Sequence, residues 1–225
     1  MKLARILLGA LAVAALLSAS AAQAQPGTTY RVTITNLTRA QPVTPPVVAT
    51  HSLAFHVFLP GTTASDALAL LAEEGDTSEL VADLEAAGGV LDVAVGEGPL
   101  MPGQSTTVEV QAHGRHVFLS VVGMLATTND AFFGLEGYSL KGNPRRRHVE
   151  VPAYDAGSEE NNELCAFIPG PPCMSPGVRA TDGAEGIIAV HSGIHGIGDL
   201  PPEVWDWRNP VVRIDIVRLA GNQGE

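Results

Sequence analysis

The sequence predicts an all-β protein, an antiparallel Greek-key β-sandwich with two short helices between strands. Several segments alternate apolar and polar residues with a period of two, which is typical of half-buried strands. The chain is rich in turn formers, with 24 glycines and 16 prolines among 225 residues, and helical periodicity is confined to one region. About seven or eight strands of this kind fit a sandwich.

The strands differ in how they are expected to be buried. Residues 30–37 alternate and predict a strand with one face in the core, whereas residues 116–125 are almost all apolar and predict a central strand buried on both faces. The proline-rich residues 41–48 are expected to be an extended connection. The full set of predicted strands is 30–37, 52–59, 90–95, 105–111, 116–125, 187–191 and 211–219.

Both helices are expected between the second and third strands. Residues 65–74 place three leucines behind a Ser/Asp start, and Gly75 ends the run. A capping-box pattern with Asp76 as the cap and Glu79 three residues later begins the second helix, which ends at Gly88-Gly89. Both helices are predicted to cover a sheet surface.

The first 24 residues have the pattern of a signal peptide. Lys2 and Arg5 precede an apolar run of 12 residues, 6–17, and Ala22-Gln23-Ala24 is a cleavage pattern. The run is shorter than the roughly 20 residues of a membrane-spanning helix, and no transmembrane segment is expected after it. We expect a secreted or periplasmic protein with a single domain over residues 25–225.

The charge of the expected mature chain limits the classes of partner that it is expected to bind. Without residues 1–24 it has 11 Lys and Arg against 24 Asp and Glu, a formal net charge of −13. Nucleic-acid binding requires a basic face, so no nucleic-acid partner is expected. An acidic exported protein is suited to binding cations or basic partners.

Two cysteines, Cys165 and Cys173, are present. Export places them in an oxidising compartment, where a disulfide between them is expected. The loop between them is short, so the bond would add about 2–3 kcal/mol by restricting the unfolded chain.

Carboxylates gather in two segments after the predicted central strand. Asp130 lies in residues 127–135, and Asp155 and Glu159 lie in residues 154–160. Calcium takes about six to eight hard oxygen ligands, which carboxylates supply. The sequence therefore permits a calcium site formed by two loops, although a solvated acidic loop surface explains the same spacing, and the EF-hand pattern is not present.

Both segments resemble motifs of the spondin N-terminal domain family, the module of F-spondin and mindin that also occurs in secreted bacterial proteins. Asp130-Ala131-Phe132-Phe133-Gly134 is similar to the family's Asp-Trp-Phe-x-Gly segment. Tyr154-Asp155-Ala156-Gly157-Ser158-Glu159 is similar to its Tyr-Asp-Ala-Gly-Thr-Asp segment. The similarity extends over residues 28–220.

This resemblance implies a sandwich similar to calcium-binding C-two-type domains, with a calcium ion held by Asp130, Asp155 and Glu159. Ala131 stands where the family has tryptophan, and Glu159 where it has aspartate, so Glu160 or Glu163 is an alternative ligand. The implied function is non-enzymatic: extracellular adhesion or binding of a matrix, cell-surface or lipid ligand.

A histidine cluster offers a second hypothesis. His191 and His195 lie four residues apart in a glycine-rich segment, and His51 is a candidate third ligand. Such a set would suit zinc or copper in an exported metal-binding protein or metalloenzyme. Hydrogen bonding of these histidines to a tight loop is the simpler explanation.

Catalytic motifs give no support for an enzyme. The sequence contains neither a G-x-S-x-G nucleophile elbow nor a phosphate-binding loop with its lysine. Two further motifs remain open. Trp205 and Trp207 form either a binding surface or a plug of the sandwich, and the basic run 145–148 is either a solvated turn or a site for an anionic lipid or polysaccharide.

Overall fold

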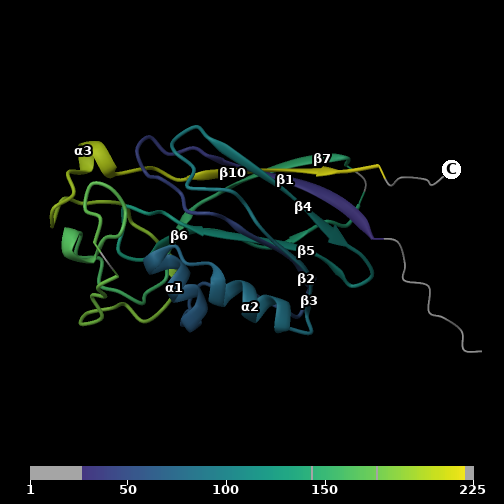
Figure 1. The fold of residues 1–225 in the computed structure, drawn as a ribbon, viewed down its shortest axis with the longest axis horizontal. Helices are drawn as coiled ribbons and strands as arrows, with labels where there is room; N and C mark the ends of the chain where they lie inside the picture. The colour runs from purple at the N-terminus through teal and green to yellow at the C-terminus, as the bar shows by residue number, and fades with distance from the viewer. Residues whose placement is uncertain (1–26, 143, 176, 221–225) are drawn as a thin grey trace, which may run out of the picture.

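The protein is described here by a computed structural model covering residues 27–142, 144–175 and 177–220. The expected signal peptide, residues 1–24, lies outside the described residues. Two antiparallel sheets of four and six strands pack against each other (Figure 1), which confirms the predicted sandwich.

The four-stranded sheet has the order β4-β1-β10-β7. Its inner face is formed by alternate residues, such as Val32 and Ile34 of β1 and Ile214 of β10, all fully buried. The strands are β1 (Thr28–Asn36), β4 (Ser105–Ala112), β7 (Arg146–Val151) and β10 (Val212–Arg218).

The six-stranded sheet has the order β3-β2-β5-β6-β8-β9. As predicted, β5 is central and buried on both faces: Leu119 and Val121 face the four-stranded sheet, and Val122 faces the helices. The strands are β2 (Val47–Ser52), β3 (Val90–Val95), β5 (His116–Met124), β6 (Ala131–Ser139), β8 (Ala153–Asp155) and β9 (Ala189–Val190).

Helices α1 (Asp66–Glu74) and α2 (Ser78–Ala86) cover the outer face of the six-stranded sheet (Figure 1). The Ser65 hydroxyl accepts a hydrogen bond from the Leu68 amide at 3.2 Å and caps α1. Gly75 ends it in the left-handed conformation at φ 71°. Asp76 accepts from the Ser78 amide at 2.8 Å, but the N-cap of α2 is Thr77, so the predicted capping box with Asp76 as the cap is wrong.

Several predicted boundaries are wrong. Residues 53–59 are not a strand: Leu53 is 67% exposed, and Phe58 is the buried residue of this segment. The strand is instead β2, part of which was assigned to the proline-rich connection. Three further strands, β6, β7 and β8, were not predicted. Their residues do not alternate clearly between apolar and polar: β6 contains two glycines, β7 is rich in charged residues, and β8 is only three residues long.

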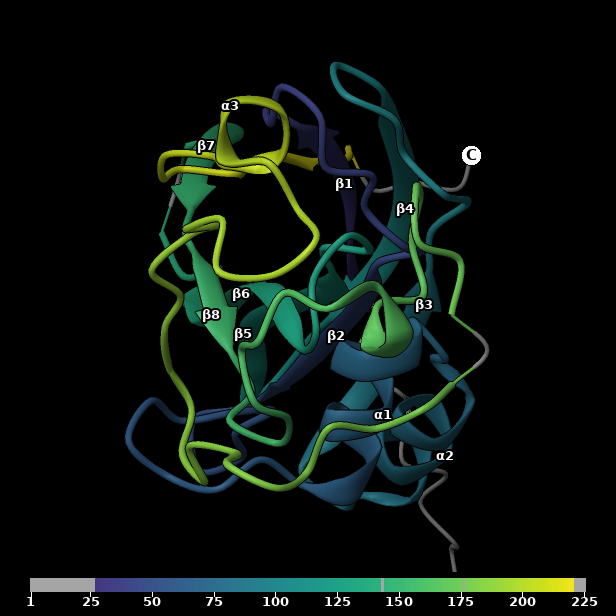
Figure 2. The same ribbon diagram turned by 90° about the vertical axis from the view of Figure 1, so that its left-hand side faces the viewer.

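Long connections gather at one end of the sandwich, which we call the loop end (Figure 2). It contains the β5–β6 connection, residues 156–175, 177–188 and 191–211, with the 3-10 turn Cys165–Phe167 and helix α3 (Pro202–Trp205). Trp207 is buried there against the core. Within the described part of the chain, no helix is long and apolar enough to cross a membrane.

The corrected position of Phe58 can be tested by substitution. Its ring lies 5.1 Å from those of both Phe132 and Tyr154, between the 53–59 segment and strands β6 and β8. We expect Phe58→Ala to lower the free energy of unfolding by about 3–5 kcal/mol. The exposed Leu53→Ala should change it by less than about 0.5 kcal/mol. Urea unfolding measures both, and equal effects would contradict the assignment.

Candidate metal centre

Asp130 is the last residue of the β5–β6 connection and is completely buried. The turn before it is closed by Thr128, whose hydroxyl donates to the Leu125 carbonyl at 2.6 Å and accepts from the Ala131 amide at 3.0 Å. Gln41 holds the same connection, accepting from the Thr127 amide at 3.2 Å. These hydrogen bonds fix the conformation of the connection and therefore the position of Asp130.

Asp155 reaches the same place from β8. β6 and β8 are antiparallel, and Ala131 is paired directly with Asp155. The Ala156 amide donates to the Asp130 carbonyl at 3.2 Å, so the chains remain together beyond the strands. The register of this pair thus brings the two carboxylates together.

Backbone amides of the turn after β8 bind the two carboxylates. Oδ2 of Asp130 accepts from the amides of Ser158 at 2.8 Å and Glu159 at 3.0 Å. Oδ1 of Asp155 accepts from the Gly157 amide at 2.6 Å. Gly157 is required, because its φ is 68° and an added Cβ would lie 2.4 Å from the Ile187 carbonyl oxygen.

One oxygen in this arrangement is not satisfied. Oδ1 of Asp130 is buried and has no hydrogen-bond partner among the described residues. Burying a polar atom without a partner is costly, and more so when the group is charged. A proton shared with the Asp155 carboxylate would satisfy this atom. An oxygen-binding cation would also satisfy it, so the residues fit a hard cation such as calcium.

Burial and like charge disfavour ionisation here. Burial, followed by the charge of Asp155, raises the pKa of the Asp130 carboxyl to about 8 despite its hydrogen bonds. Burial is also the main reason that the pKa of Asp155 is raised. Near neutral pH a proton and a cation would compete for the pair.

Glu159 is placed differently from the other two predicted ligands. Its amide faces Asp130, but its carboxylate turns away and accepts from the Ala180 amide at 2.6 Å. Burial raises its pKa to about 7, and Glu73 adds to the shift. The structure therefore brings Asp130 and Asp155 together and leaves the Glu159 carboxylate outside the pair.

Asn161 and Glu185 were not among the predicted site residues. The Asn161 side-chain amide donates to Oδ2 of Asp155 at 2.6 Å and to Glu185 at 3.1 Å. Glu185 is thus linked to Asp155 through Asn161, whereas the Glu159 carboxylate is not, so Glu185 is the better candidate for a third carboxylate ligand. Its segment, Asp182-Gly183-Ala184-Glu185, is acidic and glycine-containing, which was the available signal.

Glu163, an alternative ligand in the sequence analysis, holds a loop instead. Its buried carboxylate accepts from the amides of His195 at 2.5 Å, Gly196 at 2.7 Å and Ile197 at 2.9 Å. Three amides converging on one carboxylate form an anion-binding nest. Glu163 therefore fixes the 191–199 loop, while Glu160 is exposed.

The three histidines of the second hypothesis are not brought together. His51 lies in β2, where its ring nitrogens bond to the Ser52 carbonyl and the Ser120 hydroxyl. His191 accepts from the Gly193 amide, so its other nitrogen donates to Asn161 at 2.9 Å. Burial lowers the pKa of His191 to about 4, which keeps it neutral. His195 has an exposed side chain.

Across the described ranges, no three His, Cys, Asp or Glu side chains are arranged as a ready-made metal site. To hold a metal ion, the Asp130–Asp155 pair would need either movement of a third carboxylate or oxygen ligands of another kind.

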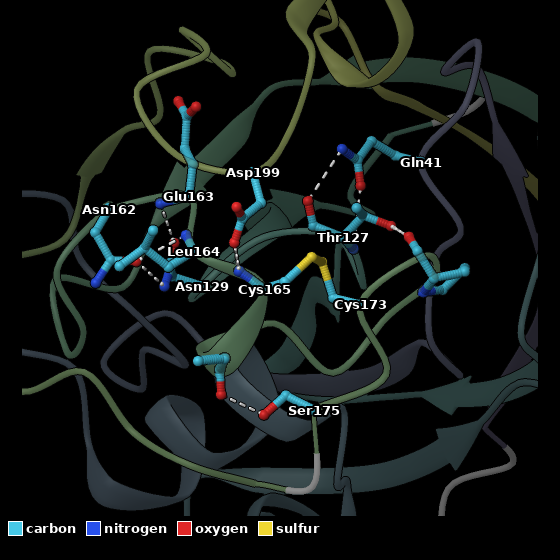
Figure 3. The surroundings of a disulfide bond; sticks show 12 residues. Gln41, Thr127, Asn129, Asn162, Glu163, Leu164, Cys165, Cys173, Ser175 and Asp199 are labelled. Carbon is cyan, nitrogen blue, oxygen red and sulfur yellow. Dashed lines mark hydrogen bonds between the residues drawn. A yellow bond between two sulfur atoms is a disulfide. The ribbon is translucent and has the colours of Figure 1, made fainter.

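The predicted disulfide between Cys165 and Cys173 is confirmed (Figure 3). Its loop packs on the connection that aims Asp130: the Gly170 amide donates to the Ala126 carbonyl at 2.8 Å, and the Thr127 hydroxyl to the Pro171 carbonyl at 2.7 Å. The disulfide thus supports one side of the candidate centre.

A comparison with protein families identifies the family of the chain. The sequence model of the Spondin_N family matches residues 38–164, which is more than half of the chain and includes Asp130 and Asp155. The chain belongs to the spondin N-terminal domain family. No curated protein matches the chain. Membership of the spondin family and the disulfide together indicate an extracellular or secreted protein.

The Asp130 carboxyl should make the stability of this spondin domain fall with rising pH. Its pKa is about 8 when folded and about 3.9 when unfolded, so its contribution is fully present below about pH 4 and is lost as the pH rises through 8. We expect Asp130→Asn, measured with chelator, to be more stable than the natural protein at pH 8.5 by a few kcal/mol and similar at pH 4.

Urea unfolding at the two pH values measures this difference. The exposed Asp182→Asn is the matched control, because it removes the same charge from the surface. Parallel pH dependences of Asp130→Asn and the natural protein would contradict the assignment.

Proposed function

We propose that this spondin domain is an exported, non-enzymatic binding module with a calcium ion at the Asp130–Asp155 pair. The observation that carries the proposal is the buried, unpartnered Oδ1 of Asp130 beside a second buried carboxylate. A calcium ion would offset the repulsion between the two charges and give that oxygen a partner.

Asp130, Asp155 and Glu185 are the proposed carboxylate ligands. Asn161 already holds Glu185 beside Asp155, whereas Glu159 would first have to release the Ala180 amide. A bound ion would join the β5–β6 connection to the 155–161 turn and the 180–187 segment. The role of calcium is then to stiffen the loop end.

The stiffened loop end would present a surface to a matrix or cell-surface ligand. Asp130 is fully buried and His191 nearly so, and a substrate cannot reach them without opening the loops. This burial supports a structural role for the ion, and we propose no catalytic reaction. Export through a signal peptide over residues 1–24 is part of the same proposal.

Calcium should raise the melting temperature of the mature protein. At about ten times its dissociation constant it adds about 1.4 kcal/mol, a shift of about 3–5 °C for a domain of this size. Extracellular sites often bind in the range of about 10⁻⁴–10⁻³ M, so millimolar calcium against chelator is the comparison. The shift should disappear in Asp130→Asn with Asp155→Asn.

Single variants identify the third ligand. Glu185→Gln should reduce the calcium shift, and Glu159→Gln should keep it. The reverse pattern would make Glu159 the ligand, as the family resemblance implies. An undiminished shift in the double aspartate variant would contradict this site.

Calcium binding should also release a proton. The pKa of Asp130 is about 8 without the ion, and calcium requires the ionised form, so affinity should fall by about tenfold for each pH unit below 7. Calorimetric titration at pH 7 in two buffers of different ionisation enthalpy measures the release. A heat that is independent of the buffer would contradict the linkage.

A further inference from the structure

The positive charges of the domain are concentrated opposite the loop end. Six of the 13 Lys and Arg in the chain lie in the β4–β5 turn, the β6–β7 connection with the start of β7, and the end of β10. Figure 1 shows these three places at the same end of the sandwich. We call the exposed residues there the basic end: Arg115, Lys141, Arg145, Arg146 and Arg218.

Backbone pairing makes these connections neighbours. The Arg218 amide donates to the Arg145 carbonyl at 2.9 Å, and Arg146 is paired with Val217. The Leu140 amide donates to the Val117 carbonyl at 2.8 Å, which joins the β6–β7 connection to the start of β5 beside Arg115.

The sixth cation, Arg147, organises the basic end. Its guanidinium donates to the carbonyls of Ser139 at 2.6 Å and Lys141 at 2.8 Å, with longer bonds to those of Leu140 and Gly142. It therefore holds the turn that carries Lys141, whose ammonium lies 5.4 Å from the centre of the Phe118 ring.

The charges of the basic end are not neutralised within the described residues. In the described part of the chain, the arginines that form ion pairs are Arg31, Arg179, Arg208 and Arg213, none of which belongs to the basic end. The acids of β3 and β4 already have partners: Glu109 of β4 pairs with Arg31, and Asp92 of β3 accepts from the Gln111 amide. The pKa of His116 is lowered by burial and then by Arg115 and His113, as expected in a positive field.

The loop end has the opposite charge. Its exposed acids are Glu160, Asp182, Glu185, Asp199 and Glu203. The domain is therefore electrically polar along its length. At physiological ionic strength the screening length is about 8 Å, so an anionic surface in contact with the basic end would feel the arginines and little of the distant acids.

We propose that the basic end docks on phosphate groups at an anionic lipid surface. Four of its five cations are arginines, whose planar guanidinium binds phosphate in a bidentate manner. They stand on turns and strand ends, which suits contact with a planar surface. Docking would point the loop end away from the membrane.

This proposal does not depend on calcium, so it is tested with chelator present. The probe is vesicles of phosphatidylcholine with about 30% phosphatidylglycerol, compared with phosphatidylcholine alone at about 0.1 M salt. The mature protein should float with the anionic vesicles only. Added salt should weaken the binding.

Matched variants locate the contact. Arg115→Gln with Arg145→Gln and Arg146→Gln should reduce vesicle binding by roughly 100-fold, because each surface cation contributes about fivefold. Arg31→Gln with Arg208→Gln and Arg213→Gln removes the same charge from ion-paired positions and should reduce binding by less than about fivefold. Equal losses in the two triple variants, or no binding of the natural protein, would overturn the proposal.

Three further outcomes would replace the lipid surface with another partner. Displacement from the vesicles by millimolar inorganic phosphate would indicate a site for free phosphate. Binding to an acidic polysaccharide without binding to vesicles would indicate a glycan. Concentration-dependent association of the natural protein that the basic-end variant abolishes would indicate the acidic loop end of a second copy.

Discussion

The loop end depends on the pairing of β6 with β8. This short ladder sets Ala131 opposite Asp155 and so forces two acidic side chains into one buried place. Because strand pairing fixes both backbones, neither carboxylate can move away from the other without breaking the ladder. The amides of residues 157–159 offset part of the electrostatic cost, and one oxygen of Asp130 remains unsatisfied. Burial and like charge therefore favour the protonated form of Asp130.

The surrounding loops are held by polar contacts more than by regular structure. Glu163 gathers three amides of the 191–199 loop, and Asn161 joins Asp155 to His191. The disulfide loop rests on the connection before Asp130. The Asn161 contact reaches Asp155, and the disulfide loop contacts the connection before Asp130, so an ion bound at the pair would affect the loops that these contacts join.

Charge divides the molecule into two ends of opposite sign. The acids cluster where long loops can enclose a cation, and the free arginines cluster on short turns where little else competes for them. Net charge alone conceals this arrangement, because the excess of acids masks the local excess of bases. An acidic protein can thus carry a surface suited to anions, provided that the two ends are separated by more than the screening length.

The sequence by itself determined the sandwich, both helices, the disulfide and the two acidic segments, because these follow from local periodicity, capping residues, redox compartment and motif. It did not determine β6, β7 and β8, whose apolar pattern is interrupted, or the strand at residues 47–52. Only the tertiary structure decided that the Glu159 carboxylate turns to Ala180, that Glu185 lies by Asp155 and that the three histidines stay apart. It also decided that the arginines of three distant segments share one end. The physical reason is that side-chain direction and long-range neighbours depend on strand register and loop packing, which residue spacing along the chain does not encode.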